Sequence, residues 1–149
     1  MIKSAGERFK SYSNAWFINS SFQDIFKNKK IIGRKFDTVI IAGVSMYIND
    51  ADLRKCYDSL ADVLNEGAIV YIEESIGVNE RLTLDHIWSD SLKDNYNAIY
   101  RTRDEIKEIL KDTLLNKNFA IETERFLFEA DELNNRKETK QYYYILKRK

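Results

Sequence analysis

The run of residues 36–44, with the sequence FDTVIIAGV, constrains the fold of this chain more than any other feature. Its apolar part is continuous instead of alternating, which is typical of a strand buried on both faces in a parallel sheet. Gly43 interrupts the β-branched run at the end of the strand, where a backbone without a Cβ allows close approach of another group. Ligands of open α/β sheets bind outside the carboxyl ends of the strands, so this end is the first place to expect a site.

The residues that follow this strand predict a helix and a second strand. Asn49 or Asp50 supplies the N-cap, apolar residues recur at helical spacing over 50–65, and Gly67 is the expected end. Residues 68–72 are again apolar. A strand, a helix and a strand in this order indicate an α/β fold with parallel strands.

Other segments precede and interrupt this pattern with weaker signals. Apolar residues at helical spacing predict a short helix over residues 1–12, and the aromatic and β-branched run over 15–19 predicts a short strand. Residues 76–100 form a polar insertion, in which a helix over 81–92 is predicted. The basic stretch over 27–35 is interpreted as a cationic surface loop.

The C-terminal part adds a helix and a pair of strands. Thr102 and Glu105 form a capping box, and Asn118 is expected to close this helical region in a left-handed conformation. Residues 119–128 and 141–147 predict two strands joined by a polar loop. Since such a pair runs antiparallel, the sheet is expected to be parallel up to its last strand and antiparallel at the end.

Composition narrows the functions that this chain can have. Its single cysteine and single histidine exclude an internal disulfide, a cysteine zinc site and a multi-histidine site, so no metal is expected. The 24 basic and 24 acidic residues give no net charge, and neither nucleic acid nor a membrane surface is expected as a partner. No apolar run is long enough to span a bilayer and no signal-peptide pattern opens the sequence, so the expected location is cytoplasmic.

Local motifs accompany this order of elements. They are FDTVIIAGVSMYIND at 36–50, LADVLNEGA at 60–68, Tyr-Arg-Thr at 100–102 before a helix and Asn-Phe at 118–119 after it. With these motifs the chain resembles the class I S-adenosylmethionine (SAM)-dependent methyltransferases over nearly its whole length. The resemblance implies a Rossmann-like methyltransferase sheet that is mostly parallel and ends in an antiparallel hairpin. It also implies SAM as the cofactor and methyl transfer to O or N of a small-molecule or other modest acceptor.

The beginning of the sequence departs from the family pattern. The family fold opens with a strand, a glycine-rich loop and a helix, followed by a second strand that ends in an acidic residue for the ribose. The five glycines of this chain are scattered, and no two have a G-x-G spacing. The resemblance therefore implies a single, N-terminally truncated domain over residues 1–149 that lacks the first two strands. The alternative interpretation is a non-catalytic remnant or interaction module that does not bind SAM.

The absent strands bear on how the chain associates. In the family, the strand over 38–44 pairs with the first strand of the fold, so its edge is expected to be open here. An open apolar edge is a template for pairing with another chain. We therefore expect a homo-oligomer, or pairing of this edge with a segment that another chain supplies.

The resemblance assigns six residues to the cofactor. They are Ser21, Phe22 and Gln23 in the segment that holds the adenine, and Ala42, Gly43 and Val44 at the strand end that faces SAM. The alternatives are an ordinary loop with a capping serine for the first group and packing at the strand end for the second.

The acceptor is assigned to two regions of the sequence. Met46 and Tyr47 fall between cofactor and acceptor, and Arg101 is expected to pair with an anionic acceptor. The candidate catalytic residues are Tyr47, which orients an acceptor hydroxyl or amine, and the general bases Glu73 and His86. The alternatives are an aromatic staple for Tyr47, a solvated carboxylate for Glu73 and an idle surface histidine for His86. For Arg101 the alternative is an ion pair near a helix cap.

Overall fold

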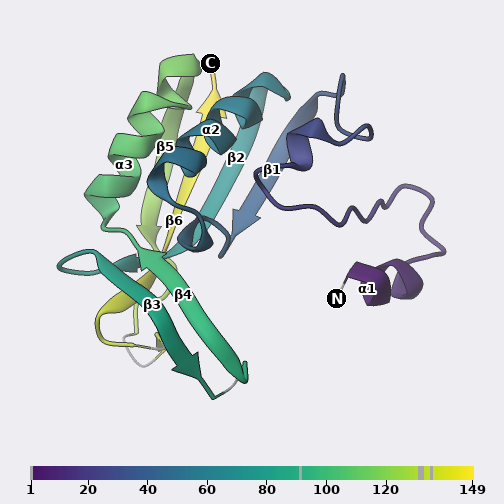
Figure 1. Ribbon diagram of the computed structural model, residues 1–149. Coiled ribbons are helices and arrows are strands. Elements are labelled where there is room, and N and C mark those ends of the chain that lie inside the picture. Colours follow the sequence, from purple (N-terminus) through teal and green to yellow (C-terminus); the bar gives the residue numbers. More distant parts are fainter. Residues whose placement is uncertain (1, 91, 131–132, 135) are drawn as a thin grey trace.

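The computed structural model describes residues 2–90, 92–130, 133–134 and 136–149 (Figure 1). A four-stranded sheet in the order β1-β2-β6-β5 forms its centre, and a two-stranded sheet of β3 and β4 projects from one end. The central strands are β1 (Phe36–Ala42), β2 (Leu64–Gly77), β5 (Phe119–Phe126) and β6 (Thr139–Arg148). The projecting strands are β3 (Leu82–Ser89) and β4 (Asp94–Tyr100). Helices α2 (Asp50–Asp62) and α3 (Arg103–Asp112) pack on the sheet, whereas α1 (Ile2–Arg8) lies apart from it.

The central sheet is mixed in its strand directions. β1 pairs with β2 in parallel, and β6 pairs antiparallel with both β2 and β5. The α/β class and the C-terminal antiparallel hairpin are therefore confirmed. β1, β2 and β5 run in one direction and β6 runs against them, so the expectation that the strands are parallel up to the last one is confirmed for strand direction. The sheet is not mostly parallel in its pairings, because β6 lies between β2 and β5 and leaves one parallel pair among the described strands.

One face of the central sheet carries the core. On β2, alternate side chains such as Val70 and Ile72 are fully buried under α2 and α3. The other face is less covered, with Ile40 70% exposed and Ile69 41% exposed, although Tyr143 on this face is buried beside the Tyr71 ring. The expectation that both faces of β1 are buried is wrong, because α2 and α3 cover one face of the sheet (Figure 1), and Ile41 is buried whereas its neighbour Ile40 is exposed.

The structure contains the helix caps from which the starts of α2 and α3 were predicted. The Asn49 side chain accepts from the backbone N–H of Asp52, and the Thr102–Glu105 capping box is formed in both directions. Asn118 has a φ of 64°, so its left-handed conformation is confirmed. Gly67 lies within β2 instead of capping α2, which ends at Asp62.

The polar insertion is a β-hairpin, and the described residues within 81–92 form no helix. Leu82 and Leu84 alternate with polar residues, and this period of two is typical of a strand. Both leucines pack with Ala98 and Tyr100.

The N-terminal predictions are confirmed only in part. α1 ends at Arg8, short of residue 12, and Met1 lies outside the described residues. The predicted strand over 15–19 is wrong, because these residues form an irregular segment. Its Trp16 ring is half exposed and stacks 4.2 Å from the Arg34 guanidinium. No helix in the described part of the chain is long and apolar enough to cross a membrane.

Candidate functional site

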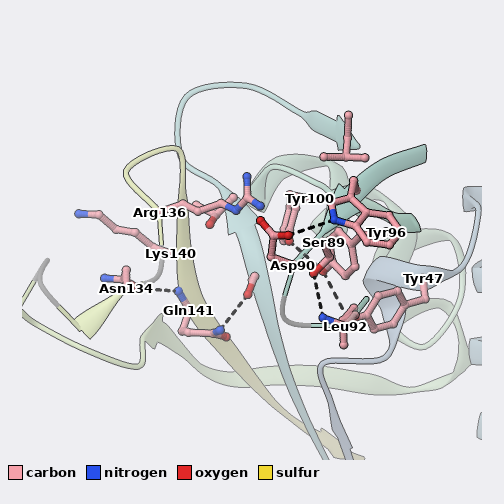
Figure 2. A pocket seen from close by; sticks show the side chains of 14 residues that line it. Tyr47, Ser89, Asp90, Leu92, Tyr96, Tyr100, Asn134, Arg136, Lys140 and Gln141 are labelled. Atoms are coloured by element: carbon pink, nitrogen blue, oxygen red, sulfur yellow. Dashed lines mark hydrogen bonds between the residues drawn. The ribbon is translucent and has the colours of Figure 1, made fainter. Parts of the chain in front are cut away.

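A cavity of about 690 Å³ lies where the carboxyl ends of the parallel strands meet the projecting hairpin (Figure 2). Its lining comes from the turn after β1, from the end of β2, from the β3–β4 hairpin and from the segment that enters β6. The volume is within the range of about 300–1,000 Å³ that small-molecule sites occupy. The cavity therefore has the position and the size of a ligand site.

Three tyrosine hydroxyls form a chain along one wall of the cavity. The Tyr96 hydroxyl lies 3.0 Å from that of Tyr100 and 3.4 Å from that of Tyr47. Burial, together with the hydrogen bonds to Tyr100 and Tyr47, raises the pKa of Tyr96 above its usual value. Tyr96 is therefore a neutral phenol at neutral pH and acts as a hydrogen-bond donor or acceptor, not as a base.

The opposite wall is polar. The Gln141 amide nitrogen donates to Ser75 Oγ at 2.8 Å, and the Gln141 backbone N–H donates to Asn134 Oδ1 at 3.0 Å. Figure 2 shows the Arg136 guanidinium extending toward the tyrosines, while Lys140 points away from them. The cavity thus has an aromatic side and a polar side that carries a cation.

The turn that presents Tyr47 is held by two buried ionisable residues. One oxygen of Glu74 accepts from the backbone N–H groups of Val44 and Ser45, at 3.3 and 2.9 Å. Arg101 donates to the carbonyl oxygens of Ser45 and Ile48, the first at 2.9 Å. Each of these two residues is 2% exposed. Because one binds N–H groups and the other binds carbonyls, the turn over residues 44–48 is fixed from both of its polar sides.

An ion-pair network connects this turn to helix α3. The Arg101 Nε donates to Asp50 Oδ1 at 2.7 Å, and Arg81 pairs with both Asp50 and Glu105. These partners lower the pKa of Asp50, with the Arg81 hydrogen bond as the largest cause. Burial raises the pKa of Glu74 against the opposing effect of its hydrogen bonds to Ser45 and Val44. The network therefore couples the Tyr47 turn to the capping box of α3.

The structure separates the predicted acceptor residues into two groups. Tyr47 lines the cavity, and Met46 packs against the β3–β4 hairpin below it. Arg101 is buried and donates to protein groups, so it does not face an acceptor. Glu73 lies on the uncovered face of the sheet and accepts from Tyr71 at 2.9 Å, outside the cavity lining. His86 is exposed outside the cavity, with Nδ1 2.6 Å from Asp85.

Sequence reasoning missed several residues that line the cavity. Trp88, Tyr96 and Tyr100 come from the hairpin, and Arg136 comes from the segment before β6. The aromatic residues of the polar insertion were an available signal. No comparable sequence signal marked Arg136, because it is one of several basic residues in a polar segment.

A second, apolar groove of about 380 Å³ lies beside β1. It is lined by Ser21, Phe22 and Val44, whereas Gln23, Ala42 and Gly43 do not line it. The Phe22 ring packs against those of Phe26 and Tyr57, and Ser21 Oγ donates to Asp24 at 2.9 Å.

The apolar groove fits one part of SAM. Its walls are serine, phenylalanine, isoleucine, valine and leucine side chains, which suit a flat adenine ring. The described lining carries no charged side chain for a ribose or an amino-acid group. Gly43, with a φ of 61°, has open space where a Cβ would point, so a ligand has access to the backbone next to the groove. The residues present therefore fit the adenine end of SAM and not the whole molecule.

A three-residue metal cluster of histidine, cysteine, aspartate or glutamate is not found among the residues that the structure describes.

Three solved structures with the same fold are described below, and each of them is named as a methyltransferase. A SAM-dependent methyltransferase from Leishmania major matches 97% of this chain and 50% of its own length, with a TM-score of 0.66 and 14% identity. An O-methyltransferase of a Brevibacillus brevis polyketide synthase, in complex with S-adenosyl-L-homocysteine (SAH), matches 99% and 55%, with a TM-score of 0.63 and 13% identity. Magnesium protoporphyrin IX methyltransferase from Synechocystis, with bound SAM, matches 99% and 52%, with a TM-score of 0.58 and 14% identity.

These matches define the class of fold. The chain has the fold of class I SAM-dependent methyltransferases over nearly its whole length, and it spans about half the length of these solved structures. No protein-family model matches the sequence, and no curated protein matches it in sequence.

Proposed function

We propose that this chain forms the acceptor-binding part of a SAM-dependent methyltransferase, which transfers a methyl group to O or N of a small molecule. The observation that carries the proposal is the methyltransferase fold, matched over 97% or more of the chain in structures that include SAM and SAH complexes. The cavity of about 690 Å³ at the carboxyl ends of the strands supports it, because this is where ligands of such sheets bind.

The residues of this chain have positioning roles in the proposal. SAM supplies a methyl group already activated on a sulfonium, so the protein contributes mainly alignment of donor and acceptor. The turn over residues 44–48 lies between the apolar groove and the cavity, with Val44 in the lining of the first and Tyr47 in that of the second. Glu74 and Arg101 fix this turn, and with it the direction of the Tyr47 hydroxyl.

We also propose that the apolar groove becomes a full SAM site when a further polypeptide segment pairs with the free edge of β1. The sheet order places β1 at an edge, and the exposed Ile40 lies on the uncovered face beside it. The unpaired backbone groups of an edge strand can form hydrogen bonds with a segment of another chain or with a second copy of this chain. The same open edge favours the alternative function, an interaction module that does not bind SAM.

Calorimetric titration with SAH and with adenosine tests the proposal. An adenine of ten heavy atoms, at about 0.3 kcal/mol per atom, gives a Kd in the millimolar range. The chain alone is therefore expected to bind both ligands at similar millimolar strength, because the groove holds the part that they share. Binding of neither ligand would support the interaction module, and micromolar binding of SAH would show a complete site in this chain.

A further inference from the structure

The aromatic wall of the cavity carries several exposed apolar side chains that lie close together. Trp88 is 59% exposed, Leu92 is 61% exposed and Ile87 is 49% exposed, and all three line the same cavity on the β3–β4 hairpin. Tyr47 and Tyr96 meet edge to face beside them, with ring centroids 6.0 Å apart. Grouped exposed apolar side chains mark binding sites, so this wall fits an apolar, ring-containing body.

The polar wall supplies a cation to the same cavity. The Arg136 guanidinium points toward the tyrosines in Figure 2, and it forms no ion pair with a described carboxylate. Lys140 is directed elsewhere, with its ammonium 5.5 Å from the centre of the Phe126 ring. Asp90, the carboxylate in the lining, accepts from the Trp88 indole N–H at 3.1 Å. The guanidinium fork matches a carboxylate, which it binds with two parallel hydrogen bonds.

The hydroxyl chain adds polar groups between these two walls. Tyr47, Tyr96 and Tyr100 have their hydroxyls within 3.4 Å of the next in the chain, and a neutral phenol donates to an anionic oxygen. The phenol donors on the aromatic side and the Arg136 cation on the polar side therefore both favour the anionic end of a ligand.

We infer that the ligand of this cavity is a small organic carboxylate with a ring-containing apolar body. The ring lies against Trp88 and Tyr96, and the carboxylate meets Arg136. Naming this ligand as the methyl acceptor rests on the proposed function, whereas the binding preference rests on the cavity alone.

Trp88 can report on binding directly. The chain has two tryptophans, and Trp16 lies in the N-terminal segment outside the cavity lining, so the Trp16→Phe variant leaves Trp88 as the single fluorescent indole. This variant is titrated with phenylbutyrate, phenylbutyramide and phenylbutylamine, which share one body and differ in the charge of the head group. We expect Trp88 emission to change with all three, and the carboxylate to bind about fivefold more tightly than the amide. The amine is expected to bind most weakly.

A matched pair of variants assigns this preference to Arg136. In the Trp16→Phe background, Arg136→Gln is expected to make the carboxylate and the amide equal. Lys137→Gln removes the same charge from the adjacent exposed residue, outside the cavity lining, and is expected to keep the preference. Tighter binding of the amine, equal binding of all three ligands, or an unchanged preference in Arg136→Gln would overturn the inference. No SAM is present in these titrations, so failure of the carboxylate preference and failure of SAH binding are separate results.

Discussion

Replacing Arg101 by methionine tests whether this residue holds the Tyr47 turn. Arg101 is 2% exposed and donates to two carbonyl oxygens, those of Ser45 and Ile48. Asp50 keeps a two-pronged contact with Arg81, at 2.9 and 3.2 Å, so the substitution does not leave that carboxylate unpaired. The main cost is the loss of these donors, which leaves the buried Ile48 carbonyl without its Arg101 partner and the Ser45 carbonyl with only the Ile48 backbone N–H, at 3.2 Å.

A buried carbonyl left without a donor costs about 1–3 kcal/mol, and removal of one partner from a buried charged network costs about 3–5 kcal/mol. We expect Arg101→Met to lower the free energy of unfolding by about 3–4 kcal/mol, out of a total of about 5–15 kcal/mol.

Urea unfolding followed by circular dichroism measures this change. With an m-value of about 2 kcal/mol/M, the midpoint should fall by about 1.5–2 M. Arg103→Met is the matched control, because its side chain is 53% exposed, and it should change the free energy of unfolding by less than about 1 kcal/mol. A loss below about 1 kcal/mol in Arg101→Met would refute the clamp and return Arg101 to the candidates for direct ligand contact.

Three other substitutions give further tests. Burial raises the pKa of Glu74, so the folded protein keeps a proton that the unfolded chain releases, and stability should fall as the pH rises from the usual glutamate pKa through the raised one. Glu74→Gln should remove this fall above the usual glutamate pKa in urea unfolding, and an unchanged pH dependence would contradict it. Thr102→Ala should cost about 1 kcal/mol in the same assay through loss of the α3 cap, and no cost would count against that cap. Ile40→Lys, at a side chain that is 70% exposed, should weaken self-association in light scattering with a stability change of about 0.5 kcal/mol or less. Unchanged association would remove β1 as the interface.

The elements with a strong local signal were predictable. The apolar run of β1, the Asn49 cap of α2 and the capping box of α3 all carry their structure in a few adjacent residues. The β3–β4 hairpin was missed because its alternation is short, and its apolar side chains at Leu82 and Leu84 are spaced by polar ones. Burial of both faces of β1 was inferred from its continuous apolar run, although whether a face is covered depends on which helices pack against it.

The roles of single charged residues were harder to predict. Glu73 and Glu74 are adjacent in β2, so they point to opposite faces of the sheet. Glu74 shares its face with the buried residues Ile72 and Ile76, and this alternation was the signal that separates it from Glu73. Arg101 carried no comparable signal, because its partners at Ser45 and Ile48 are more than 50 residues away in the sequence.

The proposed function depends on where a SAM-like ligand binds to this chain. Two-dimensional ¹H–¹⁵N NMR of the labelled chain, titrated with SAH, measures this residue by residue. We expect saturable shifts with a Kd in the millimolar range, centred on the amides of Ser21, Phe22 and Val44 and extending to Gly43. Signals of the hairpin residues Trp88 and Tyr96 should stay unchanged, because they line the other cavity. No shifts at saturating SAH, or shifts centred on the hairpin instead of the groove, would contradict the proposed function.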